Sequence, residues 1–480
     1  MKEKSFLSHF IIIGSGTIIS MAIGLITTPI ITRIINTADY GEYSIFQMYA
    51  NIALMVFCIG LDQSLMRFYY DLEDIDYKRK LLHKCTLTPI IITMILGIII
   101  IMLSLLGINK FEFETMGLVL LVICVVFQII NRMTLIVLRL EFKSKVYSTI
   151  NIIHKVIFII CILLLYYIFK NKNFYNLAIS MTASYGIAAI IGILVQKELW
   201  KKEKNVHIYI DMKKIYRYGI PYIIAMGITT LFQAIDKISL NYYYGYSEVG
   251  IYASAMTLIN IFAIIQTTFN ALWTPLAIKH FNDNKEDRTF YSNGNKLITV
   301  IMFLLGITLI LFKDIFVLLL GNAYRDAIYI LPCLIFNPMM YTISETTVCG
   351  LVFKEKSKMQ VIIAIISCIV NAIGNMILVP ILGGKGAAIS TGISYIVFFT
   401  VRTVISKYYF NVNYNLGKFY TLTIIVLIFA LYNTFVKFNI ITIIFYIIIC
   451  LLIIVLYLDA VQQILRMMKE KFNNIIKLKR

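Results

Sequence analysis

The chain has 480 residues, of which 60% are hydrophobic and 14% are charged, and its formal net charge is +19. Soluble proteins are roughly 25% charged, so this sequence has too little polar surface to cover a globule of its size, which excludes a soluble enzyme. The content of only 24 Gly and 7 Pro, together with long apolar stretches, excludes collagen and disorder. The eight Cys form no CxxC pair and mostly fall in apolar stretches, which indicates small hydrophobic side chains rather than disulfides or zinc ligands.

Apolar stretches recur along the whole chain, and a helix needs about 20 such residues to cross a bilayer. They predict an all-α integral membrane protein with fourteen transmembrane helices, near residues 8–32, 43–61, 86–108, 115–138, 147–169, 174–196, 218–243, 248–273, 295–319, 327–350, 359–382, 385–408, 418–436 and 440–458. The first stretch has no small-residue cleavage site before a polar region, so we expect a retained helix rather than a signal peptide.

Positive charges alternate between the predicted loops. With the N-terminus in the cytoplasm, the segments on that side hold 32 Lys and Arg, and those on the opposite side hold 8. Cytoplasmic loops are enriched in Lys and Arg, so both termini are predicted to be cytoplasmic. The abundance of Ile, Lys, Asn and Tyr indicates an AT-rich bacterial genome and therefore a bacterial cell membrane. The net charge then follows from topology and requires no nucleic-acid partner. The last four basic residues lie inside predicted spans: Arg132, Lys155, Lys237 and Arg402.

Catalytic motifs are missing from the sequence. No predicted outer loop exceeds about fifteen residues, which leaves no room for the extracellular domain of a glycosyltransferase or polymerase. There is no GxxxxGK[ST] phosphate loop and no HExxH zinc motif. We therefore expect a protein that is not an enzyme, with no catalytic residue, no cofactor and no metal site.

A repeat with an offset of 209 residues relates the two halves. The segment Asp39–Tyr43 has an acid, a Gly and a Tyr at the spacing found again in Glu248–Tyr252, and Asn51 falls on Asn260. Six predicted helices follow the same offset, which predicts a parallel duplication around a central cavity, as in transporters. The predicted parts are an N-lobe (1–200), a C-lobe (201–410), two added helices (411–458) and a cytoplasmic basic tail (459–480).

Several segments resemble the polysaccharide biosynthesis flippases, the Wzx-like members of the multidrug/oligosaccharidyl-lipid/polysaccharide exporter superfamily. They are Pro29–Asn36, Asp39–Tyr43, Gly60–Tyr69, Tyr218–Pro221, Asp236–Lys237 and Gly250–Tyr252. The resemblance extends over the whole chain in helix count, and it implies a lipid-linked oligosaccharide as substrate. The sequence departs from the family at Lys237, where Arg is usual, and Lys cannot make the bidentate phosphate contact of Arg.

Two neighbouring charged residues lie in the seventh predicted span. Ionisable groups inside spans usually face a cavity or a partner. We interpret Lys237 as a phosphate contact and Asp236 as the sensor of a coupling cation or proton, with snorkelling and an interhelical salt bridge as the alternatives.

One face of the fourth span carries Gln128, Arg132 and Arg139 at helical spacing. We interpret Arg132 as a pyrophosphate contact near the cytoplasmic entrance, with snorkelling to head groups as the alternative. Lys155, on the fifth span, is interpreted as an anchor to lipid head groups, and His154 as a packed imidazole.

Further polar residues complete the candidate set. Arg33 and Arg67, at the ends of the first two spans, are candidate substrate contacts, and Arg67 could instead cap its helix or pair with an acid. Gln266 and Asn270, four residues apart, could bind sugar hydroxyls or hydrogen-bond between helices. Glu345 is a candidate for ion coupling or for pairing.

The function that these expectations favour is a flippase. The resemblance implies that it moves an undecaprenyl-pyrophosphate-linked oligosaccharide from the inner to the outer leaflet by alternating access, for surface polysaccharide synthesis. Its partners would be membrane lipids and the glycosyltransferases and polymerase of the pathway, and its energy would come from an H+ or Na+ gradient or from consumption of the product. The alternatives are a multidrug cation antiporter of the same superfamily, a lipid II or spore-cortex precursor flippase, and a membrane acyltransferase or polymerase.

Overall fold

The structure is a computed structural model that describes residues 3–108, 112–170, 172–201, 210–463 and 465–466. These residues form helices and connecting turns, with no strand among them, so the all-α prediction is confirmed. The chain divides into two compact units, Met1–Ala234 and Ile235–Arg480. Most of the predicted basic tail (459–480) lies outside the described residues.

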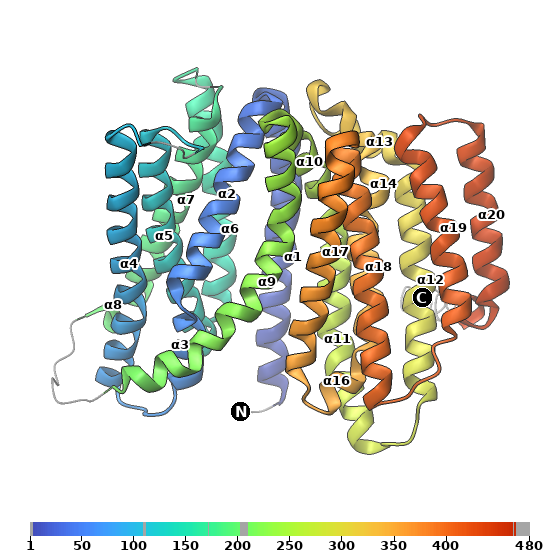
Figure 1. The fold of residues 1–480 in the computed structure, drawn as a ribbon. Helices are drawn as coiled ribbons and strands as arrows, with labels where there is room; N and C mark the ends of the chain where they lie inside the picture. The colour runs from blue at the N-terminus through green and yellow to red at the C-terminus, as the bar shows by residue number, and fades with distance from the viewer. Residues whose placement is uncertain (1–2, 109–111, 171, 202–209, 464, 467–480) are drawn as a thin grey trace, which may run out of the picture. The chain divides into compact units, whose positions relative to one another are not determined.

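The described residues of the first unit form eight helices and the beginning of a ninth (Figure 1). They are α1 (Glu3–Ile34), α2 (Thr37–Cys58), α3 (Leu61–Phe68), α4 (Ile75–Leu105), α5 (Thr115–Leu140), α6 (Ser144–Tyr167), α7 (Phe174–Val195), α8 (Lys197–Trp200) and α9 (Met212–Tyr244), of which the residues up to Ala234 belong to this unit. Helix α5 packs against α2, α4 and α7, and α6 packs against α1 and α7. Helices α5 and α6 also pack against each other.

The second unit holds the end of α9 and the remaining helices. They are α10 (Tyr246–Ile259), α11 (Ile261–Asp283), α12 (Thr289–Leu311), α13 (Lys313–Val317), the 3-10 helix η1 (Asn322–Tyr329), α14 (Leu331–Leu334), α15 (Phe336–Thr347), α16 (Cys349–Phe353), α17 (Ser357–Leu382), α18 (Gly384–Tyr409), α19 (Leu416–Phe435) and α20 (Ile440–Leu456). Helix α18 packs against α15 and α17, and α19 packs against α20.

Within the part of the chain that the structure describes, ten helices are long and apolar enough to cross a membrane, or up to thirteen if each of three bent pairs is one span, and α20 is a shorter apolar helix. One face of α4 leaves apolar side chains exposed at helical spacing: Leu87, Ile91, Met94, Ile95, Ile98 and Met102. Such a stripe is costly in water and favourable in lipid. The protein is therefore an integral, multi-pass membrane protein, while the count of fourteen spans stays a prediction.

In three places the sequence predicts one uninterrupted helix, whereas the structure has a bent pair of helices. Helices α2 and α3 meet at 52°. The bend lies at Ile59 and Gly60, which both have positive φ, and Gly60 also contacts the backbone of α9. A Cβ atom at Gly60 would lie 2.1 Å from the Gly219 carbonyl oxygen, so only Gly fits. The other pairs bend by 45° between α10 and α11 and by 57° between η1 and the segment that begins at Leu331.

The same capping hydrogen bond occurs once in each unit. The backbone N–H of Phe174, at the start of α7, donates to Asp39 over 2.8 Å. The backbone N–H of Gly384, at the start of α18, donates to Glu248 over 2.8 Å. Both acids satisfy an N–H group that the helix itself leaves without a partner. Asp39 and Glu248 are the two acids that the sequence repeat aligns, so the two bonds support the predicted duplication.

Candidate functional site

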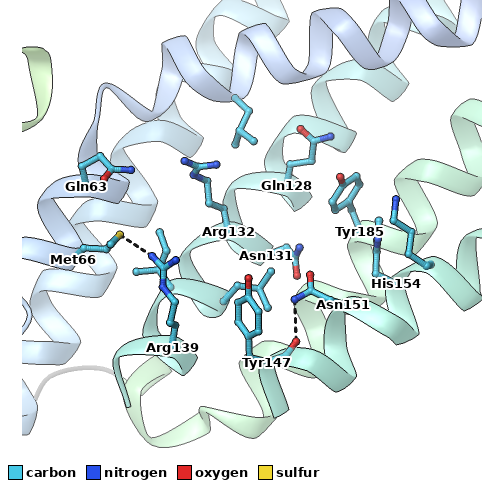
Figure 2. Close-up of a pocket in the computed structure, with 14 residues that line it drawn as sticks. Gln63, Met66, Gln128, Asn131, Arg132, Arg139, Tyr147, Asn151, His154 and Tyr185 are labelled. Carbon is cyan, nitrogen blue, oxygen red and sulfur yellow. Dashed lines mark hydrogen bonds between the residues drawn. The ribbon is translucent and has the colours of Figure 1, made fainter. Parts of the chain in front are cut away.

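A cavity of about 460 Å³ lies within the first unit (Figure 2). Five helices contribute side chains to its wall. The lining residues are Leu54 of α2, Gln63 and Met66 of α3, Gln128, Asn131, Arg132, Leu135, Ile136 and Arg139 of α5, Tyr147, Asn151, His154 and Lys155 of α6, and Tyr185 of α7. Residues three or four apart share one face of a helix, and the lining positions of α5 and α6 follow this spacing. Each of these two helices therefore presents a polar face to the same space.

Arg132 is held by an acid from α3. Its Nε atom donates to Asp62 Oδ2 over 2.9 Å, and its Nη2 atom donates to the same oxygen. The side chain of Asp62 is only 4% exposed, whereas that of Arg132 is 38% exposed. Both residues line a neighbouring cavity of about 650 Å³ beside α9, and Arg132 lines the 460 Å³ cavity as well. Burial of the carboxylate is costly unless it is paired, and Arg132 supplies that partner.

Two further cations line the 460 Å³ cavity without an acidic partner. Arg139 donates to the thioether sulfur of Met66 over 3.1 Å, and no ion pair to Arg139 or Lys155 is found among the described residues. No carboxylate belongs to the described lining itself, and Asp62 neutralises only Arg132. The cavity is thus net positive. The sequence interpretation of Lys155 as an anchor to lipid head groups is corrected, because its side chain lines this cavity.

The second unit buries an acid in a different way. Asp236 of α9 is 5% exposed and accepts four hydrogen bonds from neutral side chains. The donors are Tyr252 (2.6 Å), Thr391 (2.6 Å), Asn375 (2.8 Å) and Asn371 (3.2 Å). These donors come from α10, α17 and α18, so one carboxylate of α9 connects four helices, two of which are far from it in the sequence.

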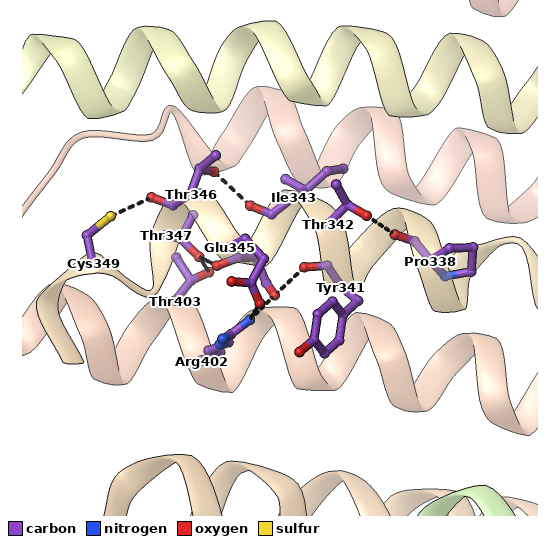
Figure 3. A network of polar contacts seen from close by, with 11 residues as sticks. Pro338, Tyr341, Thr342, Ile343, Glu345, Thr346, Thr347, Cys349, Arg402 and Thr403 are labelled. Carbon is purple, nitrogen blue, oxygen red and sulfur yellow. Dashed lines mark hydrogen bonds and ion pairs between the residues drawn. The ribbon is translucent and has the colours of Figure 1, made fainter. Parts of the chain in front are cut away.

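Glu345 is paired (Figure 3). Arg402 of α18 donates to Glu345 of α15 over 2.8 Å and to Ser344 Oγ over 2.6 Å. The two charged side chains are 6% and 12% exposed, respectively. The guanidinium also lies 5.3 Å from the ring centre of Phe398. The sequence leaves two roles open for Glu345, ion coupling and pairing, and in the structure it is paired with Arg402.

The other predicted contacts lie outside the two cavities described above, and their role with substrate stays a prediction. Arg33 is exposed in the last turn of α1. Arg67 is exposed and pairs with Asp71 over 3.2 Å. Lys237 is half-buried beside Asp236, and Gln266 and Asn270 are half-buried on α11.

Sequence reasoning missed several residues of these sites. On α6 a helical spacing joins Tyr147, Asn151 and His154, and this signal could have revealed the polar face. Nothing local points to the pair of Asp62 and Arg132, which are 70 residues apart.

Comparisons with known proteins agree with this architecture. The family model described as "Polysaccharide biosynthesis protein" matches residues 6–277, which is more than half of the chain. No match was found among curated proteins. Among solved structures, the lipid II flippase MurJ in an inward closed conformation is 18% identical, with a TM-score of 0.70 over 95% of this chain and 99% of that chain. An inward-facing multidrug resistance MATE transporter of the MOP superfamily is 13% identical, with a TM-score of 0.62 over 82% of this chain and 94% of that chain. The chain therefore belongs to the polysaccharide biosynthesis protein family, and it has the fold shared by MurJ and the MATE transporters.

Proposed function

We propose that the protein is a flippase for an undecaprenyl-pyrophosphate-linked oligosaccharide. It works in the bacterial cytoplasmic membrane with both termini in the cytoplasm, and it moves its substrate from the inner to the outer leaflet by alternating access of the two lobes. A sugar–pyrophosphate head group cannot cross hydrocarbon unaided, because burial of its charges and hydroxyls without partners is costly. A polar cavity can hold the head group while the prenyl chain stays in lipid.

The observation that carries this proposal is the positive charge of the cavity in the first unit. Arg139 and Lys155 line it without acidic partners, and Arg132 has only Asp62. Cations in a membrane-embedded cavity attract anions and repel other cations, and phosphate oxygens make charge-assisted hydrogen bonds with them. This favours an anionic substrate over the cargo of a multidrug cation antiporter. Lipid II and spore-cortex precursors share the pyrophosphate chemistry and stay as alternatives.

Coupling to a cation gradient is assigned to Asp236. Its carboxylate accepts four hydrogen bonds from neutral side chains, and the cation that interacts with it electrostatically is its neighbour Lys237. H+ or Na+ would therefore compete there with hydrogen bonds and one Lys rather than with a buried Arg pair. Glu345, by contrast, is paired with Arg402. The proposed pathway partners are the glycosyltransferases and the polymerase that make and use the oligosaccharide.

The test is transport in vesicles. Purified protein is reconstituted with undecaprenyl-pyrophosphate that carries a fluorescent oligosaccharide, and exposure of the label to a membrane-impermeant reductant is followed in time. We expect fast exposure with the wild-type protein, and the double variant Arg139→Gln/Lys155→Gln should be slower by about 100-fold, since each cation contributes about 1.5 kcal/mol. The matched control Lys358→Gln/Lys437→Gln removes two exposed cations elsewhere and should behave as the wild-type protein.

The same vesicles test the coupling role. Asp236→Asn should abolish the acceleration by an imposed H+ or Na+ gradient while leaving transport without a gradient in place. Transport by the wild-type protein that is no faster than in empty vesicles would contradict the flippase proposal, and an unchanged gradient response in Asp236→Asn would contradict the coupling role alone.

A further inference from the structure

The cavity of the first unit contains a group of uncharged polar side chains that the pyrophosphate contacts leave unexplained. We call this group the amide cluster, and it consists of Gln128, Asn131, Asn151, His154 and Tyr185. In Figure 2, Gln128, His154 and Tyr185 lie on one side of the cavity, and Arg139 and Met66 lie on the opposite side.

Buried polar atoms of the amide cluster have no hydrogen-bond partner among the described residues. They are both side-chain atoms of Gln128, Oδ1 of Asn131 and Nε2 of His154. Gln128 is 2% exposed and Asn131 is 7% exposed. A buried polar atom without a partner is destabilising, and most buried polar groups in proteins have partners. Four such atoms around one cavity are therefore expected where a ligand completes the bonding.

The unpartnered atoms specify the chemistry of that ligand. The amide nitrogen of Gln128 needs an acceptor, whereas its oxygen and that of Asn131 need donors. Phosphate oxygens at neutral pH are almost entirely acceptors, so a pyrophosphate satisfies only part of this set. A hydroxyl group both donates and accepts, and a sugar ring carries several hydroxyl groups at fixed spacing. The cavity of about 460 Å³ also falls within the range of about 300–1,000 Å³ that is typical of small-ligand sites.

We propose that the amide cluster is a subsite for the hydroxyl groups of a sugar ring, separate from the cations that attract the pyrophosphate. This inference rests on the proposed function and divides the cavity between two parts of one substrate. Arg139 and Lys155 provide affinity for any lipid pyrophosphate. Gln128 and Asn131 make the protein prefer a lipid that carries a sugar, because their buried polar atoms remain unpaired when the sugar is missing.

A structural role for Gln128 makes a different prediction. An amide that stabilises helix packing would lose hydrogen bonds on replacement by Leu, and the protein would melt at a lower temperature. Gln196 is the matched control, since it is also a buried Gln of the first unit and its Nε2 atom donates to the Thr134 carbonyl oxygen over 3.1 Å. We expect Gln128→Leu to keep or raise the melting temperature and Gln196→Leu to lower it.

The deciding experiment compares two lipids on the purified full-length protein. The dissociation constant is measured for undecaprenyl pyrophosphate and for the same lipid carrying one neutral N-acetylhexosamine. The wild-type protein should bind the sugar-bearing lipid about tenfold more tightly, and Gln128→Leu should remove this preference without weakening the binding of the sugar-free lipid. Gln196→Leu should keep the preference.

Two results would overturn the sugar subsite while leaving the flippase proposal intact. One is equal affinity of the wild-type protein for the two lipids, and the other is a preference that persists in Gln128→Leu. Failure of the wild-type protein to bind either lipid would instead overturn the proposed function, and the sugar subsite with it.

Discussion

The two units bury their acids in opposite ways. In the first unit, Asp62 pairs with one cation, Arg132, whose side chain lines two cavities. In the second unit, Asp236 faces four neutral donors from three helices. An ion pair at a cavity can open when an anionic ligand competes for the Arg, whereas a carboxylate held by neutral donors is stabilised by hydrogen bonds alone.

This difference arises on a shared framework. Helices α1 and α2 begin at residues 3 and 37, and α9 and α10 begin at residues 212 and 246, which is an offset of 209 in both cases. With this offset Asp236 corresponds to Thr27, whose hydroxyl donates to its own helix at the Ile23 carbonyl oxygen. Arg132 corresponds to Tyr341. The two units thus share the pattern of apolar helices and the capping of α7 and α18. They differ in their buried polar groups, so each unit can bind a different ligand.

The largest expected effect concerns the most deeply buried ion pair of the second unit. Arg402→Met leaves Glu345 buried without its cation, which should destabilise the protein by about 3–5 kcal/mol. The double variant Arg402→Met/Glu345→Gln should recover most of that loss, because no charge remains unpaired. The measurement is the apparent melting temperature in detergent, and a single variant as stable as the double variant would show that the pair is not structural.

The corresponding change in the first unit should be milder. Arg132→Met leaves Asp62 unpaired, but the Arg132 side chain is 38% exposed and water reaches the site, so we expect a loss of about 2 kcal/mol. Asp62→Asn should instead free Arg132 and strengthen the binding of undecaprenyl pyrophosphate. Weaker lipid binding in Asp62→Asn would contradict the view that this acid competes with the substrate.

The neutral donors around Asp236 should each contribute less than an ion pair. Thr391→Val and Asn375→Leu remove hydrogen bonds of 2.6 and 2.8 Å to a carboxylate, and each should cost about 1.5 kcal/mol. Asn371→Leu removes a bond of 3.2 Å and should cost less. Melting curves of the three variants test this order, and a loss as large as that of Arg402→Met in any of them would contradict it.

The smallest expected effect concerns the helix-capping hydrogen bond that occurs in both units. Asp39→Ala and Glu248→Ala each remove the acceptor for the first N–H group of a helix, so each should cost about 1 kcal/mol. Similar losses in melting temperature are expected, since the two bonds have the same length. A large loss in one variant and none in the other would show that the two caps are not equivalent.

Much of the fold follows from the sequence, because lipid requires long apolar helices and their positions are visible as hydropathy. Each of the fourteen predicted stretches overlaps a helix or a bent pair of helices. The bends are not visible in this way. The turn at Ile59 and Gly60 depends on positive φ and on the backbone of α9 150 residues later, and neither changes the local hydropathy.

The site is predictable only in part. Arg132, Asp236 and Glu345 can be predicted from the sequence because a charged residue in an apolar stretch is conspicuous. The partners of Asp236 cannot, since Asn371 and Thr391 are more than 130 residues away from it and have ordinary polar side chains. Asn131 and Asn151 can be recognised as site residues only from the structure, in which α5 and α6 line the same cavity.

The most direct test of the central claim is the affinity of the purified protein for undecaprenyl pyrophosphate. The claim is that Arg139 and Lys155 form a cationic site for an anionic head group. The double variant Arg139→Gln/Lys155→Gln should bind this lipid about 100-fold more weakly than the wild-type protein, which is the loss of about 3 kcal/mol from two charge-assisted contacts. The control variant Lys358→Gln/Lys437→Gln should bind it with unchanged affinity. Equal affinities of the wild-type protein and the cavity variant would contradict the account.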